Sequence, residues 1–373
     1  MADRISNQRL PALDALRGIV IVLMALDHAS FAFNAGKYAT DSAAFYTAGA
    51  RIPEVQFFIR WVTHICAPTF LFLAGFALCL SITGRLSRGA SGGGVDRYLF
   101  TRGLMILLLD PLWMSIGFGY GVLFQVLYAI GGSMIAMIVL RRLNPNLLLS
   151  LSLGYLVFSE VFAGLALWAG GGERSGPIGA FLVTGGKITD GVFVLYPLLP
   201  WLAYMALGWS IGNLIITNRI KRPFRFYVAA GLGFLVIFLI FRGLNGYGNM
   251  VLYRYGTSLV QWLHVSKYPP SLTFSALELG LMFLLLAGLT RFYENRQASA
   301  WNPVIVFGQT PLFFYILHVH LLAATAKLTG LYKSAGLMET ALATFIVLIV
   351  LYPLCIQYRK FKRAHPHTLL KYV

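Results

Sequence analysis

The chain has little charge, and acidic charge in particular is scarce. Only 12% of its residues are charged, with 13 Asp and Glu against 30 Lys and Arg. Soluble domains carry about 25% charged residues. Hydrophobic residues make up 58% of the chain, and the mean hydropathy is +0.72. This balance excludes an ordinary soluble domain and indicates an integral membrane protein.

Cysteine is also scarce. The three cysteines, Cys66, Cys79 and Cys355, all fall in apolar segments, and none belongs to a CxxC pair. Short Cys and His spacings are the usual signature of a structural metal site. We therefore expect no bound metal.

Long apolar runs are abundant. A helix needs roughly 18 or more apolar residues to cross the hydrocarbon core. The sequence predicts an all-α, polytopic helix bundle of about ten transmembrane helices in a single integral membrane domain, 1–373. The runs are 13–33, 57–83, 98–117, 121–140, 147–168, 192–216, 226–242, 271–290, 303–325 and 340–357. Asp110-Pro111 interrupts the third run and predicts a kink or an early end.

The basic residues set an orientation. Lys and Arg concentrate in the amino-terminal segment, the loops after the even-numbered helices and the tail 359–363. Cytoplasmic loops carry this excess, so both termini are expected to be cytoplasmic. The long loops 34–56, 169–191 and 243–270 then lie outside. The formal charge of +17 suits anionic lipid headgroups, and we expect no nucleic acid partner.

Arg17 and His28 share one face of the first helix. Eleven steps of about 100° bring His28 to within about 20° of Arg17 and about 16 Å further along the axis. Ionisable groups in a membrane helix are costly and usually face protein or a wet cavity. The pair therefore predicts a cavity open to the cytoplasm, with Arg17 near its mouth and His28 at its inner end.

Further ionisable residues fall at a similar depth in the outer half of the bilayer. Helical rise places His28, His64, Asp110, Glu278 and His318 at this height. A common height favours a shared site, with the rings of His28 and His64 roughly 10 Å apart. Plainer interpretations are also open: His28 as a core histidine bonded to a backbone carbonyl, His64 as an ordinary histidine near the interface, and Asp110 as the cap of the kink.

Other polar and aromatic residues have structural interpretations. Asp14 and Arg17 are spaced to pair with each other, and Glu160 suits a structural hydrogen bond. Trp201 and Trp301 are expected to anchor helix ends at the membrane interface.

Several motifs, in order along almost the full chain, resemble the transmembrane acyltransferase superfamily, and most closely membrane proteins similar to heparan-alpha-glucosaminide N-acetyltransferase. They are RLPALDALRGIVIVLMALDH (9–28), THICAPTFLFLAG (63–75), RYLFTRGLMILLLD (97–110), FQVLYAIGGSMIAM (124–137), YPLLPWLAYMALGWSIG (196–212), KYPPSL (267–272) and FGQTPLFFYILHVH (307–320). The resemblance implies a helix-bundle acyltransferase that moves an acyl group from cytosolic acyl-CoA to a sugar at the outer face.

The resemblance does not fix the base. In the related acyltransferase-three family, Arg and His at the spacing of Arg17 and His28 form the functional pair. The heparan acetyltransferases carry Asn where His28 stands, Asp where His64 stands, and a catalytic His in the first outer loop. This chain has no His from Ala29 to Thr63. Either His28 or His64 therefore remains a candidate.

Acyl transfer from a thioester needs a base, an oxyanion donor and cations for the CoA phosphates. Neutral imidazole serves as base near neutral pH, and a carboxylate such as Asp110 or Glu278 would orient it. A second imidazole or Gln125 would stabilise the oxyanion. The expected phosphate-binding residues are Arg17, Arg97 and Arg102.

The sequence thus predicts an acyl-CoA-dependent acyltransferase, in particular an acetyltransferase using acetyl-CoA, in the bacterial cytoplasmic (inner) membrane. The expected partners are acyl-CoA, a sugar or glycan acceptor, the lipid bilayer and, as one option, a second copy in a homodimer. The alternative is a transporter or flippase that uses the same buried groups for proton relay or polar substrate binding. Against it, the sequence has neither an internal repeat nor an evident pair of matching broken helices.

Overall fold

The computed structural model describes residues 10–43, 45–172, 174–365 and 368. Within them, nine helices are long and apolar enough to cross a membrane, and a shorter apolar helix covers Val126–Leu140. We treat these ten apolar helical segments as the passes of the bundle. The predicted all-α polytopic membrane fold is confirmed.

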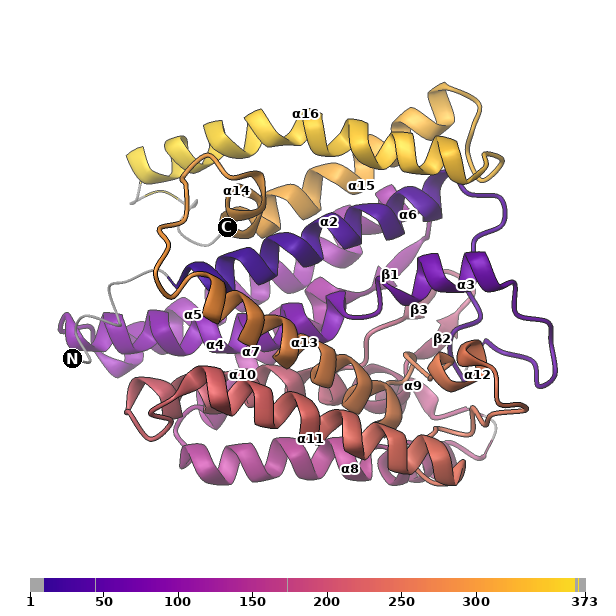
Figure 1. Cartoon of the computed structure of the whole chain (residues 1–373), viewed down its shortest axis with the longest axis horizontal. Helices are drawn as coiled ribbons and strands as arrows, with labels where there is room; N and C mark the ends of the chain where they lie inside the picture. Colours follow the sequence, from indigo (N-terminus) through magenta and orange to yellow (C-terminus); the bar gives the residue numbers. More distant parts are fainter. Residues whose placement is uncertain (1–9, 44, 173, 366–367, 369–373) are drawn as a thin grey trace.

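The ten passes run back and forth along one axis (Figure 1). They are α2 (Pro11–Phe33), α3 with α4 (Glu54–Trp61, Cys66–Ser87), α5 with α6 (Gly92–Leu109, Ser115–Phe118), α7 (Val126–Leu140), α8 (Pro145–Ala169), α10 (Leu198–Ile216), α11 (Pro223–Leu244), α13 (Leu272–Phe292), α14 with α15 (Pro303–Gln309, Pro311–Leu328) and α16 (Leu337–Ala364). The start of α2 and the end of α16 lie at one end of the bundle, and the long loops lie at the other.

Smaller elements gather at the long-loop end. They are α9 (Gly176–Gly179), a π-helical segment at Ala180–Thr184, α12 (Leu259–Leu263), β1 (Val122–Phe124), β2 (Gly186–Thr189) and β3 (Val192–Val194). The strands form a sheet in the order β1-β3-β2, with β1 parallel and β2 antiparallel to β3. This sheet joins the segment before α7 to the segment before α10.

Proline sets many helix starts. Pro11, Pro145, Pro223, Pro303 and Pro311 each stand in the first helical positions, where the missing N–H costs nothing and φ is already helical. The residue before proline avoids the α region. Thr310 accordingly adopts φ −129° and ψ 41°, and it divides the predicted run 303–325 into α14 and α15.

Three other runs also differ from prediction. The run 57–83 is interrupted between α3 and α4. Together with the break between α14 and α15 this makes two broken passes, where the sequence predicted none. The helix in 121–140 begins only at Val126, and that in 192–216 only at Leu198, because strands precede both. The run 98–117 continues past Asp110-Pro111 through a π-helical turn, Asp110–Met114, so it bends without ending.

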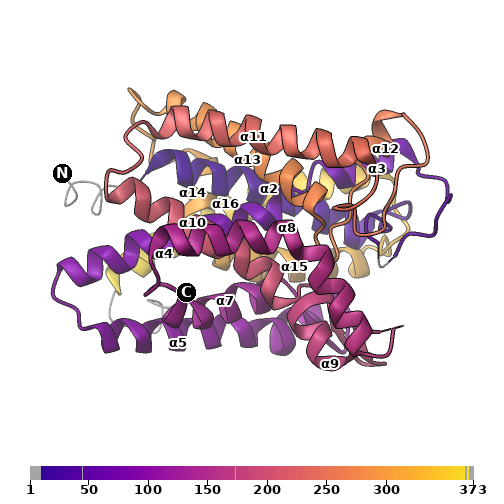
Figure 2. The same ribbon diagram turned by 90° about the horizontal axis from the view of Figure 1, so that it is seen from below.

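The core lies around α4, α10 and α13. In α10, 83% of the apolar window is buried, against 17% in α11, which lies along one side of the bundle, opposite α5 (Figure 2). A Cβ on Gly75 would meet the Met205 carbonyl oxygen at 1.8 Å, so α4 and α10 touch backbone to backbone. Trp201 lies inside this core with no exposed surface. Its predicted role as an interface anchor is wrong, whereas Trp301 is 59% exposed.

Candidate functional site

A cavity of about 290 Å³ lies between α2, α4, α5, α7, α15 and α16. Its cations come from three helices at the end of the bundle where α2 begins: Arg17, Arg102 and Lys362. The remaining lining is largely apolar and includes Met24 and Tyr315. A cationic end and an apolar interior suit a ligand with an anionic head and a long, slender arm.

Arg17 is fixed at the cationic end. Its Nη1 donates to Asp14 Oδ1 at 3.2 Å and to the Gly308 carbonyl oxygen at 3.0 Å. The predicted pairing with Asp14 is confirmed. Because α14 lies in backbone contact with α2 here, a Cβ on Gly308 would meet the Asp14 carbonyl oxygen at 1.9 Å. Both bonds use one nitrogen, so the rest of the guanidinium is left for an anion.

Of the other two arginines that were predicted to bind phosphate, only one lines the cavity. Arg102 lines the cavity and donates to the Tyr98 hydroxyl at 2.9 Å. Arg97 is exposed and does not line it. The two are five positions apart on α5, about 140° around the helix, and so face different directions.

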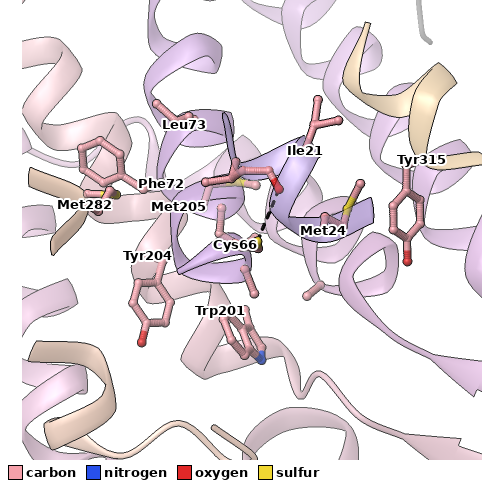
Figure 3. Close-up of a cluster of buried hydrophobic side chains, with 14 of the residues drawn as sticks. Ile21, Met24, Cys66, Phe72, Leu73, Trp201, Tyr204, Met205, Met282 and Tyr315 are labelled. Atoms are coloured by element: carbon pink, nitrogen blue, oxygen red, sulfur yellow. Dashed lines mark hydrogen bonds between the residues drawn. The ribbon is translucent and has the colours of Figure 1, made fainter. Parts of the chain in front are cut away.

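At its deep end the cavity is lined by Met24 and Tyr315, whose side chains are labelled in Figure 3. His28 is one helical turn beyond Met24, about 6 Å along the axis. Its ring centroid lies 5.2 Å from that of Phe118 and 5.9 Å from that of Tyr315. The imidazole is only partly buried. The cavity therefore ends just short of His28, which does not itself line it.

His28 and His318 form a fixed pair. His28 Nδ1 lies 2.7 Å from His318 Nε2, and His318 Nδ1 lies 3.0 Å from the Phe314 carbonyl and 2.9 Å from the Tyr315 carbonyl. Carbonyls only accept, so His318 Nδ1 carries a proton and, in the neutral ring, Nε2 has the lone pair. His28 Nδ1 must then be the donor. Neutral His28 is left with its lone pair on Nε2.

Beyond His28, towards the end of the bundle with the long loops, lies an ionic network. Lys37 Nζ and Arg60 Nη1 bind the two carboxylate oxygens of Asp27 at 2.9 and 2.6 Å. Arg60 Nε binds Asp41 Oδ2 at 2.7 Å, and His64 Nε2 donates to the same oxygen at 2.6 Å. We call these five residues the ionic network. It connects the helix of His28 to His64.

The network holds the first long loop onto the bundle. Asp41 belongs to this loop, yet it is only 1% exposed. Burial alone would raise the pKa of Asp41, but the charge of Arg60 and the hydrogen bond from His64 hold it well below its usual range. The Asp41 carbonyl also accepts the Lys267 N–H at 3.4 Å, so two of the long loops meet beside the site.

His64 is oriented by a carboxylate, but by Asp41 and neither of the carboxylates proposed from the sequence. Its Nδ1 is buried and has no hydrogen-bond partner among the described residues. No hydrogen bond or ring contact in the described chain joins His28 to His64. Their predicted separation of roughly 10 Å stays a prediction.

Asp110 binds backbone N–H groups through Oδ2, and among the described residues no hydrogen bond joins it to a histidine. Its Oδ2 accepts the N–H groups of Gln125 at 2.9 Å and Tyr128 at 2.7 Å. The chain reverses here between the π-helical turn and α7, and the carboxylate takes up N–H groups at the start of α7. The simpler interpretation, a cap at the kink, is the one the structure supports.

Glu278 and Glu160 differ in their hydrogen bonding. Glu278, on α13, is 1% exposed, and its Oε1 has no hydrogen-bond partner among the described residues. The charge of Lys267, itself 3% exposed, acts on it. Glu160 accepts the Gly248 N–H at 2.5 Å, which confirms its predicted structural hydrogen bond.

Sequence reasoning missed Asp27, Asp41, Arg60, Lys267 and Tyr315. Asp41 and Lys267 lie in loops, where depth along a helix says nothing about position. Asp27 adjoins His28, and Arg60 interrupts an apolar run; both carry the signal of a costly intramembrane charge. Tyr315 carries no such signal. Among the described residues, no cluster of three or more His, Cys, Asp or Glu could hold a metal ion.

The fold defines a polytopic helical membrane protein with ionisable side chains buried among its helices. The family model for the catalytic domain of heparan-alpha-glucosaminide N-acetyltransferase matches residues 9–243, more than half of the chain. The chain belongs to this family of membrane acetyltransferases. No match was found among curated proteins. The matched range contains Arg17, His28 and His64, whereas Glu278 and His318 lie beyond it.

Proposed function

We propose that this protein transfers an acetyl group from cytosolic acetyl-CoA to a sugar or glycan acceptor at the outer face of a bacterial cytoplasmic membrane. The observation that carries the proposal is the cavity that leads from three cations to within one turn of His28. Membership of the acetyltransferase family supports the same reaction.

The donor enters at the cationic end. Arg17, Arg102 and Lys362 bind the phosphates of CoA, for which guanidinium groups offer paired N–H donors. The apolar interior takes the pantetheine arm, so that the thioester lies beside Met24 and Tyr315. The excess of Lys and Arg in the loops at this end supports its assignment to the cytoplasm.

His28 is the general base in this proposal. Its Nε2 lone pair, held in place by His318, takes the proton as the acceptor nitrogen or oxygen attacks the thioester carbonyl carbon. The new bond to carbon forms and an oxyanion develops. When the C–S bond breaks, the CoA sulfur leaves and receives the proton from His28.

The acceptor approaches from the outer side. Buried polar groups there lack partners among the described residues, including Asp41 Oδ1, His64 Nδ1 and Glu278 Oε1. These are acceptors, and the ammonium of Lys267 is a donor. A molecule rich in hydroxyls complements both kinds of group, which favours a sugar.

The test is acetyl-CoA turnover by the purified protein in lipid nanodiscs. Released CoA is measured with a thiol reagent in the presence and absence of an amino sugar acceptor. We expect acceptor-dependent release that His28→Ala abolishes and that Arg97→Ala, an exposed cation outside the cavity, leaves unchanged. Equal release by wild type and His28→Ala would overturn the proposed base. Failure of wild type to bind acetyl-CoA would overturn the proposed function.

A further inference from the structure

Tyr315, on α15, has a buried hydroxyl without a hydrogen-bond partner among the described residues. The side chain is 5% exposed. A buried tyrosine hydroxyl usually finds a partner, and leaving one unpaired costs about 1–3 kcal/mol. A group kept in this state at a cavity wall is available to a ligand.

The position of Tyr315 is specific. Together with Met24, it lines the deep end of the cavity. Its ring centroid is 5.9 Å from that of His28 and 5.5 Å from that of His318. Its carbonyl oxygen is one of the two that fix the His318 proton. The same residue therefore touches the donor cavity, the base and the group that orients the base.

The other candidates for an oxyanion donor are less suitable. The two imidazoles are committed to each other and to backbone carbonyls. Gln125 uses its backbone N–H to bind Asp110, and it does not line the cavity. Tyr358 also lines the cavity, and its hydroxyl has no partner in the part of the chain that the structure describes. However, its ring stacks on Phe313 with the centroids 4.2 Å apart, and it lies on α16 near the charge of Arg102.

We propose that the Tyr315 hydroxyl is a catalytic residue that donates a hydrogen bond to the thioester carbonyl oxygen and stabilises the oxyanion. This inference rests on the proposed function and names a second group at that site. As the acceptor attacks, the carbonyl π electrons move to oxygen, and the Tyr315 O–H strengthens its bond to the developing charge. The hydroxyl keeps its proton. The bond weakens again when the C–S bond breaks and the carbonyl re-forms.

The test compares Tyr315→Phe with Tyr155→Phe. Tyr155, on α8, also has a buried hydroxyl without a partner among the described residues, but it lies outside the cavity. Removing one oxyanion donor lowers kcat by about 10²–10³-fold. We expect this loss in Tyr315→Phe, with KM for acetyl-CoA within about twofold of wild type. Tyr155→Phe should retain wild-type kcat.

A second measurement does not need turnover. Acetyl-CoA labelled with ¹³C at the carbonyl is bound to the His28→Ala protein, and its C=O stretch is recorded by infrared difference spectroscopy. We expect a shift to lower frequency than in water that the added Tyr315→Phe change reverses.

Wild-type kcat in Tyr315→Phe, or an unchanged carbonyl band, would overturn the role of Tyr315 while leaving the proposed function standing. Absence of acetyl-CoA binding to wild type would instead overturn the proposed function, and the role of Tyr315 with it.

Discussion

His28 Nδ1 lies 2.7 Å from His318 Nε2, across 290 positions of sequence. The backbone carbonyls behind His318 fix the direction of this hydrogen bond. The lone pair of neutral His28 is thereby placed on Nε2, away from His318. A base must be in reach, in the correct tautomer and held in place, and this contact supplies the last two conditions.

The two histidines are expected to differ in their effect on catalysis. His28→Ala should lower kcat by at least about 10²-fold, the usual contribution of a general base. His318→Ala should lower kcat less, because it leaves the base in place and removes only the contact that keeps the proton of neutral His28 on Nδ1. His318→Gln should recover part of the loss, because its amide oxygen can accept from His28 Nδ1. The measurement is kcat beside thermal unfolding in detergent. His320→Ala, two positions along α15, is the control. A fully active His28→Ala protein would make His64 the base.

Arg17→Ala should weaken donor binding more than it slows chemistry. A charge-assisted hydrogen bond contributes about 1.5–3 kcal/mol, so KM for acetyl-CoA should rise by roughly 10–100-fold with little change in kcat. Arg17→Lys should restore part of it, because it keeps the charge without the fork. The Asp14→Asn variant and the double variant Arg17→Ala with Asp14→Asn distinguish a loss of CoA binding from a loss of the Arg17–Asp14 ion pair. Unchanged CoA affinity in Arg17→Ala, with stability restored by the added Asp14→Asn change, would leave Arg17 only the pairing role.

Asp41 should make folding stability depend on pH. Its pKa in the folded protein is held below the unfolded value of about 3.9 by Arg60 and His64. Its contribution is therefore fully present above about pH 5 and is lost as pH falls through the unfolded value towards the folded one. Asp41→Asn removes this contribution and leaves Arg60 short of a buried partner, at a cost of about 3–5 kcal/mol at neutral pH.

The melting temperatures of wild type and Asp41→Asn should converge on acidification. Curves that stay parallel from pH 7 to pH 3 would contradict the prediction. Asp190→Asn is the control and should change little, because the ion pair of Asp190 with Lys187 is exposed.

Asp110→Ala should cost stability and spare catalysis. The substitution leaves the N–H groups of Gln125 and Tyr128 without their acceptor, and one such buried group costs about 1–3 kcal/mol. We expect a lower melting temperature with kcat of the folded enzyme within about twofold of wild type. A large fall in kcat without loss of stability would return Asp110 to the catalytic site.

The spans and the face shared by Arg17 and His28 followed from the sequence because hydrophobic runs and helical periodicity are local. The partner of His28 did not follow in the same way. Helical rise gave His318 a matching height, but height alone gave Asp110 the same standing. What separates them is direction around the helix axis: His318 faces α2, and Asp110 faces the backbone at the start of α7.

Loops and breaks were the least predictable parts. Asp41 lies in a polar loop, and nothing local indicates that it folds back to meet Arg60 and His64. The break at Thr310 did have a signal, since Pro311 follows it, but the apolar character of its surroundings suggested one continuous helix. Trp201 looked like an interface residue because it begins a helix; the strands before α10 bring that helix start into the core.

The chain of hydrogen bonds behind His28 has a dead end. It stops at the carbonyls of Phe314 and Tyr315, which cannot take up a proton. A proton that His28 takes from the acceptor can therefore pass only to the departing sulfur. In the proposed mechanism each turnover thus moves an acetyl group outward and carries the acceptor's proton inward as the thiol hydrogen of CoA. This exchange takes up no free proton from either compartment, so the reaction should need no proton gradient.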